Sequence, residues 1–559
     1  MKNLKKILIL NLFCWLAFAQ TEKIRLEIDG YLRNLPVDAP RISLPEFPNN
    51  IVNIKDFGAV GDGKFLNTSA IKSAIEHCSK LGGGTVLIPA GVWITGPIKL
   101  ESNINLKLER GAFLQFSKNI SDYPVIERLD DKAKKFVISS PIYSVMAENI
   151  AITGEGIIDG AGEVWRYVKK EKQTEQQWRD LIASGGVVTA DGKQWWPSRE
   201  AMEAEQYLDE LEKNGKKLTK EDVEKTKEYF RPDFVRLSRS RRILIDGVTF
   251  LNSPRFHLHM VQSENIVIRN VKVYSPWWGQ NTDGIDLSAC RDVIVYNSTV
   301  DVGDDGICIK PSNISNEQIS GPACERILIT NNIVYHAHGG FVIGSEGIGG
   351  ARNIYVYNNT FIGTDVGLRF KCARDRGGLI ENIYIENIIM RDIKEQAILF
   401  DMYYNSGDPE TVVKNYALLN KSEPITHLTP KYQNIFIKNI TCLDANRSIL
   451  INGLSELPVK NIFIEDSYIS SKLGASITNA DSIKIFNSEF KFDTSPAFTV
   501  LQSKNIEFKG IKFNPADEIF INVKGEKTKN VTFEDVHLNN PAKQILISDK
   551  ADKNAVIQK

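Results

Sequence analysis

The stretch Asn434-Ile435-Phe436-Ile437-Lys438-Asn439 decides the fold, because apolar residues alternate along it and an asparagine closes it. Alternation at period two with β-branched residues predicts a half-buried strand, and the trailing asparagine predicts a turn that tolerates left-handed backbone dihedrals. The pattern recurs in seven other segments, at 242–247, 265–270, 292–297, 353–358, 382–387, 461–466 and 505–510.

The spacing of these segments excludes most β architectures. Their starts lie mostly 21 to 34 residues apart, whereas the turns of a hairpin meander recur about every 8 to 12 residues. No helical segments between the strands could build βαβ units. We therefore predict an all-β fold, a parallel β-helix in which each coil adds short strands to stacked sheets. In the 52 residues between Asn382 and Asn434, which include Tyr403, Tyr404 and Pro409, a loop must leave the stack.

Two parts of the N-terminal half depart from the repeat. Apolar residues at helical spacing between Ala70 and Cys78 predict a short helix that closes the open end of the solenoid, within a cap over about residues 50–100. Residues 161–230 are rich in Glu, Lys, Gln and Leu, which predicts a mainly helical insertion. This insertion also carries four tryptophans, Trp165, Trp178, Trp195 and Trp196.

The first residues are typical of a cleavable signal peptide. Three lysines precede an apolar run over residues 7–18 that is too short to span a bilayer, and Ala17-Phe18-Ala19 follows the cleavage pattern. We expect a signal peptide over 1–19, a secreted or periplasmic protein, one β-helix domain over 20–549 and a C-terminal tail over 550–559.

The composition of the mature chain excludes several partners. Cleavage removes three of 69 basic residues and no acidic one, which leaves 66 basic against 69 acidic residues and a formal charge of −3. No bulk field recruits nucleic acid or membrane, and we expect neither as a partner. Six cysteines remain without CxxC pairs or metal-ligand spacing, and we favour buried free thiols over disulfides because a chain this long buries a large core. We expect a monomer without cofactor or metal.

Four short motifs follow one another at about one coil each. They are Asn281-Thr282-Asp283, Gly303-Asp304-Asp305, Ala337-His338-Gly339 and Arg369-Phe370-Lys371, with steps of 21, 34 and 31 residues from Asp283 to Asp304, His338 and Arg369. Parallel coils would stack all four on one face. Each triplet alone is a common turn or edge sequence, but their joint occurrence on successive coils favours a functional site.

The residue types in these motifs suit cleavage of an anionic sugar polymer. Inverting glycosidases use one carboxylic acid to protonate the leaving oxygen and one carboxylate to activate water. Clustered carboxylates raise one another's pKa values, which keeps at least one of them protonated near neutral pH. Asp304 and Asp305 can both serve only if the chain bends, and Gly303 and Gly306 permit a bend. Arg and Lys can hold a substrate carboxylate.

With these motifs, the chain from about Phe57 to beyond Cys442 resembles glycoside hydrolase family 28, the polygalacturonases and related pectin-backbone hydrolases. The segments Gly154–Gly160 and Asn252-Ser253-Pro254 share the resemblance. It implies a right-handed parallel β-helix that inverts the anomeric configuration. Two motifs depart from the family pattern: Ala337 replaces a glycine before the histidine, and Phe370 replaces an inward-facing isoleucine.

The resemblance implies a role for each site residue. Asp304 resembles the general acid, and Asp283 and Asp305 resemble the pair that activates water. His338 resembles the histidine that supports the acid. The residues expected to orient or bind substrate are Asn281, Lys310, Arg369, Lys371 and Tyr403, with Tyr404 as the alternative to Tyr403.

The insertion and an aromatic pair favour action at a chain end. If the insertion covers one end of the groove, only a chain terminus enters, and Trp277 and Trp278 could stack against the terminal sugar. Alternatively, the two tryptophans pack the insertion onto the solenoid. We expect an exo-acting polygalacturonase or galacturonidase on pectic polysaccharides. A rhamnogalacturonan or xylogalacturonan hydrolase, a β-helix polysaccharide lyase and a non-catalytic carbohydrate-binding protein are the alternatives.

Overall fold

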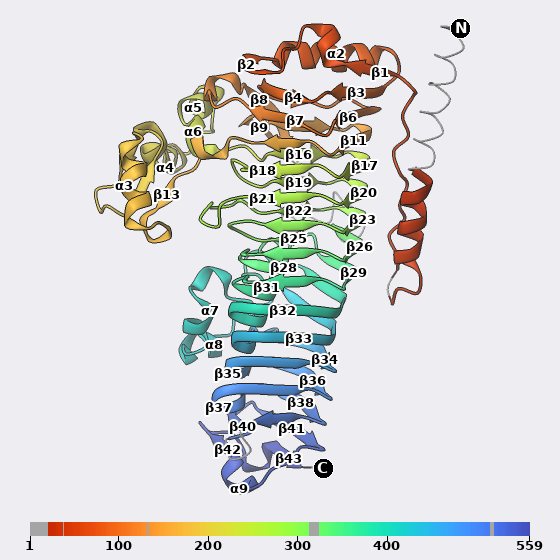
Figure 1. Ribbon diagram of the computed structural model, residues 1–559. Helices are drawn as coiled ribbons and strands as arrows, with labels where there is room; N and C mark the ends of the chain where they lie inside the picture. Colours follow the sequence, from red (N-terminus) through yellow and green to blue (C-terminus); the bar gives the residue numbers. More distant parts are fainter. Residues whose placement is uncertain (1–20, 37, 131–132, 312–322, 515–518, 559) are drawn as a thin grey trace.

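In the computed structural model the chain is a right-handed parallel β-helix, as predicted (Figure 1). The structure describes residues 21–36, 38–130, 133–311, 323–514 and 519–558, so the expected signal peptide lies outside the described residues. One sheet assembly of 38 strands runs the length of the molecule, and its strands pair in parallel with the equivalent strands of neighbouring coils.

Each coil of the central part contributes one strand to each of three stacked columns. The first column, which carries the site, contains β16 (Val235–Ser238), β19 (Leu258–Val261), β22 (Ile285–Ser288), β25 (Ile307–Lys310), β28 (Gly339–Ile343) and β31 (Val366–Lys371). The second contains β17 (Arg241–Asp246), β20 (Glu264–Arg269), β23 (Arg291–Tyr296), β26 (Cys324–Thr330) and β29 (Ala351–Tyr357). The third contains β18 (Thr249–Leu251), β21 (Lys272–Tyr274), β24 (Thr299–Asp301), β27 (Ile333–Tyr335) and β30 (Thr360–Ile362).

Long strands dominate the C-terminal coils, because single strands there continue around the corners. They begin with β32 (Leu379–Asp401), β33 (Lys431–Asn452), β34 (Val459–Glu465), β35 (Tyr468–Thr478), β36 (Ala480–Phe486) and β37 (Glu489–Leu501). The last strands are β38 (Lys504–Lys509), β39 (Lys512–Asn514), β40 (Ile521–Lys524), β41 (Lys529–Glu534), β42 (Ile545–Ser548) and β43 (Val556–Gln558). Because β43 pairs with β41, the stack continues into the residues assigned to a tail.

Asparagines make the corners that the sequence predicts. Asn358, Asn387 and Asn439, which occupy equivalent corners on successive coils, have φ angles between 51° and 56°, in the left-handed region that asparagine tolerates. Their side chains form a ladder, in which Asn387 Nδ2 donates to Asn358 Oδ1 at 3.1 Å and Asn439 Nδ2 donates to Asn387 Oδ1 at 2.6 Å. Between corners, the inward residues of each strand form one continuous apolar core.

The N-terminal cap forms as predicted. Helix α2 (Thr68–Lys80) buries Ala70, Ile71, Ala74, Ile75 and Cys78 against the first coils. These coils comprise β1 (Ile51–Asn53), β2 (Asp62–Leu66), β3 (Gly84–Ile88), β4 (Gly91–Thr95), β5 (Ile98–Lys99), β6 (Ile104–Leu108), β7 (Ala112–Phe116), β10 (Ile142–Val145), β11 (Glu148–Gly154) and β12 (Ile157–Asp159). A hairpin of β8 (Val125–Asp130) and β9 (Ala133–Ile138) leaves this part.

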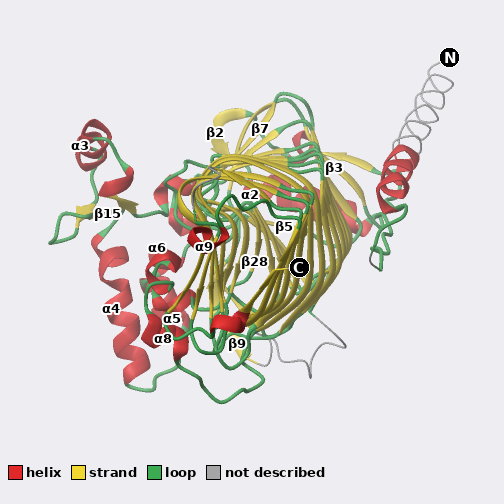
Figure 2. Cartoon of the chain, turned by 90° about the horizontal axis from the view of Figure 1, so that it is seen from below, coloured by secondary structure: helices red, strands yellow, loops and turns green. Residues whose placement is uncertain are grey.

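The insertion is mainly helical and projects from one side of the stack (Figures 1 and 2). It contains β13 (Val168–Lys169), α3 (Glu175–Ala183), β14 (Val187–Val188), β15 (Gln194–Trp196), α4 (Arg199–Lys213), α5 (Lys220–Lys225) and α6 (Lys227–Phe230). Trp178 and Trp195 form its small core with Val168. The predicted loop between β32 and β33 contains two short helices, α7 (Pro409–Val412) and α8 (Tyr416–Asn420). It projects on the same side of the stack as the insertion.

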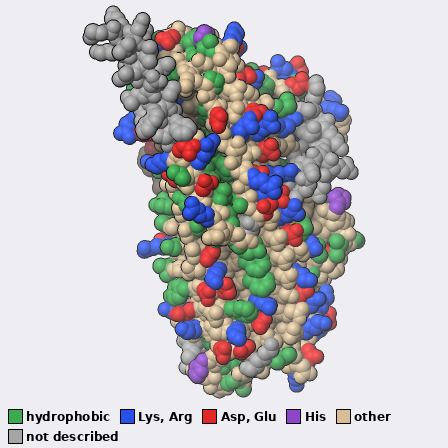
Figure 3. All heavy atoms as spheres, turned by 90° about the vertical axis from the view of Figure 1, so that its right-hand side faces the viewer, with side chains coloured by type: hydrophobic (Ala, Val, Ile, Leu, Met, Phe, Trp, Pro, Cys, Tyr) green, Lys and Arg blue, Asp and Glu red, His purple; other side chains and the backbone are tan. Residues whose placement is uncertain are grey.

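The opposite side of the stack carries the N-terminal segment. A helix over residues 21–32 packs Ile24 and Ile28 on outward residues of β20, β23 and β26. Figure 3 shows acidic, basic and hydrophobic side chains mixed over this face. The six cysteines among the described residues are all buried and free, as expected. Among the described residues, no helix combines the length and hydropathy needed to cross a membrane.

Candidate active site

The four motifs lie side by side on consecutive coils of the first column, three of them before the leading ends of strands and the fourth on a strand itself. Asp283 precedes β22, and Asp304 and Asp305 occupy the bend between β24 and β25. His338 precedes β28, and Arg369 and Lys371 lie on β31. Because the parallel register aligns β22, β25, β28 and β31, chain separations of 21 to 34 residues become distances between neighbouring coils.

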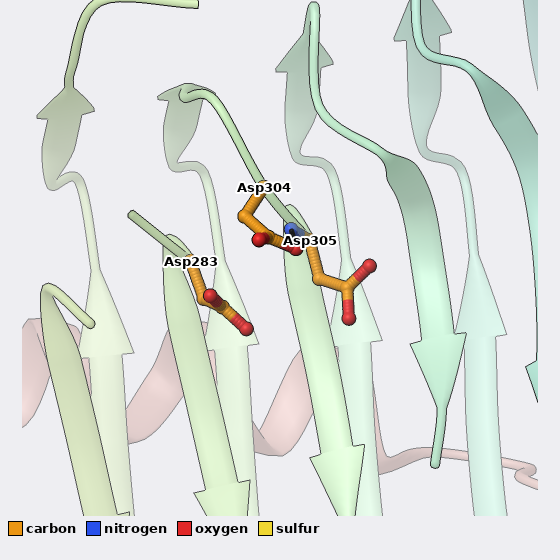
Figure 4. Close-up of side chains that lie close together, drawn as sticks. All are labelled: Asp283, Asp304 and Asp305. Carbon is orange, nitrogen blue, oxygen red and sulfur yellow. Dashed lines mark hydrogen bonds between the residues drawn. The ribbon is translucent and has the colours of Figure 1, made fainter. Parts of the chain in front are cut away.

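The three aspartates form one carboxylate cluster (Figure 4). One oxygen of each lies within 4.8 Å of the corresponding oxygens of the other two. Asp283 and Asp305 are 2% and 1% exposed, whereas the Asp304 side chain is 17% exposed. Three oxygens this close could share a metal ion. However, protein cations already contact the cluster from both sides, so the donor set does not require one.

Asp283 is held by a buried lysine. Lys310 Nζ lies 3.1 Å from Asp283 Oδ2 and 3.1 Å from Asp286 Oδ1. Burial raises the pKa of Asp283 well above its ordinary value, and the charges of Asp286 and the other two aspartates add to this effect against the influence of Lys310. Asp283 Oδ1 is buried without a hydrogen-bond partner among the described residues. This oxygen is therefore available to a water or a substrate hydroxyl.

Asp304 is surrounded by donors. The backbone N–H of Asn281 donates to Asp304 Oδ2 at 3.1 Å, and His338 Nδ1 lies 3.4 Å from Asp304 Oδ1. Burial raises the pKa of Asp304, but the hydrogen bond and charge of His338 outweigh it and bring this pKa below its ordinary value. In return, Asp304 raises the pKa of His338 against the effect of burial. Histidine and acid therefore each favour the charged form of the other.

Asp305 carries the two cations expected to hold substrate. Lys371 Nζ lies 2.7 Å from Asp305 Oδ2, and Arg369 Nη1 lies 3.3 Å from Asp305 Oδ1. Burial raises the pKa of Asp305, and the two cations together lower it below its ordinary value. Asp305 is thus ionised before substrate binds. Phe370, between the cations, faces inward and stacks on Phe400 at 4.3 Å.

In each predicted aromatic pair, one residue packs into the protein and the other is exposed. Tyr403 is 2% exposed and belongs to the core, so it does not reach the groove. Tyr404 is 37% exposed and its ring lies 5.2 Å from Lys371 Nζ, so Tyr404 is the candidate for contact with substrate. Trp278 packs on the small core of the insertion, whereas Trp277 is 53% exposed.

Sequence reasoning missed Asp286 and Arg231. Asp286 is fully buried beside Lys310, and alternation along β22 would have placed it on the outward face with Ser288. Arg231 ends the insertion and donates to Gln280 O at 3.0 Å and to Asn281 Oδ1 at 2.9 Å. No motif signals Arg231, because it follows helix α6 in the insertion, outside the repeat.

A basic cluster lies at β16 and β19, on the two coils before the one that carries Asp283. Arg236 and His259 contact Asp233 at 2.8 Å and 2.7 Å, and Arg255 lies 3.8 Å from it. Burial lowers the pKa of His259 to about 4, so it is neutral near pH 7 and the cluster has one surplus positive charge. Phe256 separates Arg255 from Lys310, at 4.4 Å and 4.8 Å from its ring.

The fold and this carboxylate cluster define a class, the β-helix enzymes that hydrolyse glycosidic bonds. The model of Glycosyl hydrolases family 28 matches residues 178–484, and the chain belongs to this family. The chain is therefore a glycoside hydrolase. Residues 51–118 also match the model of the family described as Rhamnogalacturonase A/epimerase, pectate lyase-like.

Relatives and solved structures agree with this assignment. The chain is 28% identical over 416 residues to an exo-poly-alpha-D-galacturonosidase of Dickeya chrysanthemi. The matched region covers 72% of this chain and 64% of that protein. It is 25% identical to a probable polygalacturonase of Vitis vinifera over 77% of each chain. The structure of an exopolygalacturonase from Thermotoga maritima superposes with a TM-score of 0.63 and 30% identity, covering 83% of this chain and 96% of that chain.

Proposed function

We propose that this protein is an exo-acting polygalacturonase that hydrolyses α-galacturonosidic bonds at the ends of pectic chains. The observation that carries the proposal is the cluster of Asp283, Asp304 and Asp305 beside Arg369 and Lys371. Carboxylates supply the acid and base of glycoside hydrolysis, and paired cations suit a uronic acid at the cleavage point. Two bacterial relatives carry names of exo-acting enzymes, which supports exo action, although two others are named endo-polygalacturonases.

In the proposed mechanism, Asp304 protonates the leaving glycosidic oxygen while Asp283 and Asp305 activate the attacking water. Asp305 fits the base role because its cations keep it ionised. The general acid must first carry a proton, and the positive charges of His338, Lys371 and Lys310 lower the pKa of Asp304 in this structure. A substrate carboxylate bound at Arg369 and Lys371 neutralises part of that charge, which raises the pKa of Asp304 when substrate is present.

We further propose inversion at the anomeric carbon. The cluster is tighter than the separation of about 6.5–9.5 Å between the two carboxyl groups of most inverting glycosidases. However, both oxygens of Asp305 are held by cations and those of Asp304 by donors. The oxygen without a hydrogen-bond partner among the described residues, Asp283 Oδ1, belongs to a carboxyl group whose pKa lies well above its ordinary value, which makes it a poor nucleophile. Water held between Asp283 and Asp305 is the better nucleophile.

The proposal extends to location and assembly. A signal peptide over residues 1–19 would deliver the enzyme outside the cytoplasm, where pectic polymers are found. A monomer suffices, because all the site residues come from one chain.

Product analysis tests the proposal. Incubation with polygalacturonate should release reducing galacturonate, whose first-formed anomer by NMR should be β. Asp304→Asn should abolish the release. Ultraviolet absorbance of an unsaturated product would instead identify a lyase, and cleavage of only rhamnogalacturonan or xylogalacturonan would assign the alternative hydrolases. A first-formed α-anomer would overturn inversion alone.

A further inference from the structure

The loop between β32 and β33 runs along the stack beyond the site. Side chains of four successive coils contact it: Asn452 Nδ2 donates to Pro409 O at 3.2 Å, Asn479 Nδ2 to Leu419 O at 2.8 Å, Gln502 Nε2 to Asn420 Oδ1 at 2.8 Å and Lys524 Nζ to Tyr416 OH at 2.9 Å. The α7–α8 segment, residues 409–420, therefore covers several coils on the C-terminal side of the site.

The outward face under this segment is filled with protein. The row that carries Arg369 on β31 continues as Leu399 on β32 and Leu450 on β33. Both leucines point away from the solenoid core, yet they are 1% and 0% exposed and pack with Val413. In the parallel row, Lys371 is followed by Asp401 and Asn452, which are also buried. The outward rows that carry Arg369 and Lys371 are thus covered by protein one coil after these two residues.

A partly buried ion pair fixes the segment. Both oxygens of Glu410 accept hydrogen bonds from Arg447 at 2.8 Å, and Gln396 donates to Glu410 Oε1 at 2.9 Å. A charged pair of this kind loses much of its stability when one partner is removed, which favours one position of the segment.

On the N-terminal side, the insertion reaches the coil that carries Asp283. Arg231 bonds Asn281, and Trp278 packs into the core of the insertion. Figure 1 shows the insertion and α7–α8 projecting on the same side, above and below the level of β22 and β28. Four strands of the first column, β22, β25, β28 and β31, separate these two boundaries. At a spacing of about 4.8 Å per strand, they span roughly 15 Å, the length of a few sugar rings.

We propose that α7–α8 makes this site selective for short galacturonate oligosaccharides over long galacturonan chains. The inference rests on the proposed function and narrows its substrate class. A long chain bound at one end would have to leave the groove against α7–α8, whereas a short oligomer fits between the two boundaries. The reaction that supplies its substrate is then internal cleavage of a pectic chain by another enzyme.

The test compares trigalacturonate with long polygalacturonate at equal concentrations of chain ends. The wild-type kcat/KM should be at least about tenfold higher for the trimer. Replacing residues 409–420 by a Gly-Ser linker should raise kcat/KM on the polymer and reduce this ratio to about 1–2. Glu410→Gln, a milder change, should reduce the ratio partly. Glu325→Gln, which removes a similarly buried carboxylate paired with Arg326 and Arg352, should leave it unchanged.

The outcomes separate the two levels of the proposal. Equal wild-type kcat/KM values for trimer and polymer would overturn the selectivity while leaving the polygalacturonase assignment intact. No hydrolysis of either substrate would overturn the assignment itself. Should the linker variant fail to fold, the wild-type ratio still decides the question.

Discussion

Asp286 illustrates how a single buried charge can set the pH range of this site. Burial raises the pKa of Asp286 to about 7, and burial together with the Asp286 charge raises the pKa of Asp283. Both groups compete for one cation, Lys310. Because clustered carboxylates titrate as a set, the high-pH limb of activity reports the loss of a proton that they share.

Asp286→Asn should shift that limb to lower pH. The substitution removes a neighbouring negative charge and leaves Lys310 to Asp283 alone, and both effects make Asp283 ionise more easily. Because Asp283 shares the proton of the cluster with the acid Asp304, an Asp283 that ionises more easily withdraws that proton at lower pH, and we expect the high-pH limb of kcat/KM to fall by about one pH unit or more. Asp301→Asn makes the same charge change next to His336, outside the cluster, and should leave the profile in place. An upward shift in Asp286→Asn would contradict the argument.

Lys371→Met should shift the low-pH limb of the kcat/KM profile. Lys371 holds Asp305 at 2.7 Å and lowers its pKa, so removing the cation raises the pKa at which the base ionises. The low-pH limb should then move upward, and KM for galacturonate substrates should also rise if Lys371 holds their carboxylate. Lys484→Met, on a distant coil beside Glu507, is the control. A change in KM without a shift of the limb would restrict Lys371 to substrate binding.

Single-residue reasoning from sequence succeeded where the repeat fixes the geometry. The coil period places the four motifs on one face, so the spacing of Asp283, Asp304 and Asp305 along the chain was enough to group them. Their different pKa shifts could not be predicted, because they depend on which cation reaches which carboxylate. The choice between Tyr403 and Tyr404 likewise depends on a loop that follows no repeat.

The elements that interrupt the repeat differ in how far the sequence predicts them. Composition predicts the helices of the insertion, and the 52-residue gap predicts a loop. What these elements touch is not encoded in periodicity. The contact of Arg231 with Asn281 spans 50 residues, and that of Lys524 with Tyr416 spans 108. Such contacts bring the insertion and α7–α8 to the boundaries of the site.

Arg231→Gln should reveal how the insertion supports catalysis. Arg231 positions Asn281, whose backbone N–H in turn donates to Asp304. A displacement of about 1 Å at a reacting group can cost about 10²-fold in rate, so we expect a fall in kcat of that order with KM changed far less. Arg179→Gln, on the exposed face of α3, should behave as wild type. Unchanged kcat in Arg231→Gln would show that the insertion does not act through Asn281.

At the scale of the whole molecule, an unadorned β-helix offers a groove open at both ends, and such a groove permits internal cleavage. This chain keeps the solenoid but adds about 70 residues of insertion before the site and the α7–α8 segment after it. The two additions project on the same side of the stack. The same fold can therefore host a different mode of attack without any change in the catalytic residues.

Exo action should be visible in the time course of polymer digestion. The viscosity of polygalacturonate should fall slowly relative to the release of reducing ends, and short products should be present from the first minutes. The two tryptophans provide matched variants, because Trp277 is exposed with Lys172 Nζ 5.0 Å from its ring, whereas Trp278 is partly buried against the core of the insertion. Trp277→Ala should raise KM if its ring stacks on a sugar. Trp278→Ala should chiefly lower the melting temperature. A rapid fall in viscosity with little reducing sugar would show internal cleavage, in which case the insertion does not close the groove.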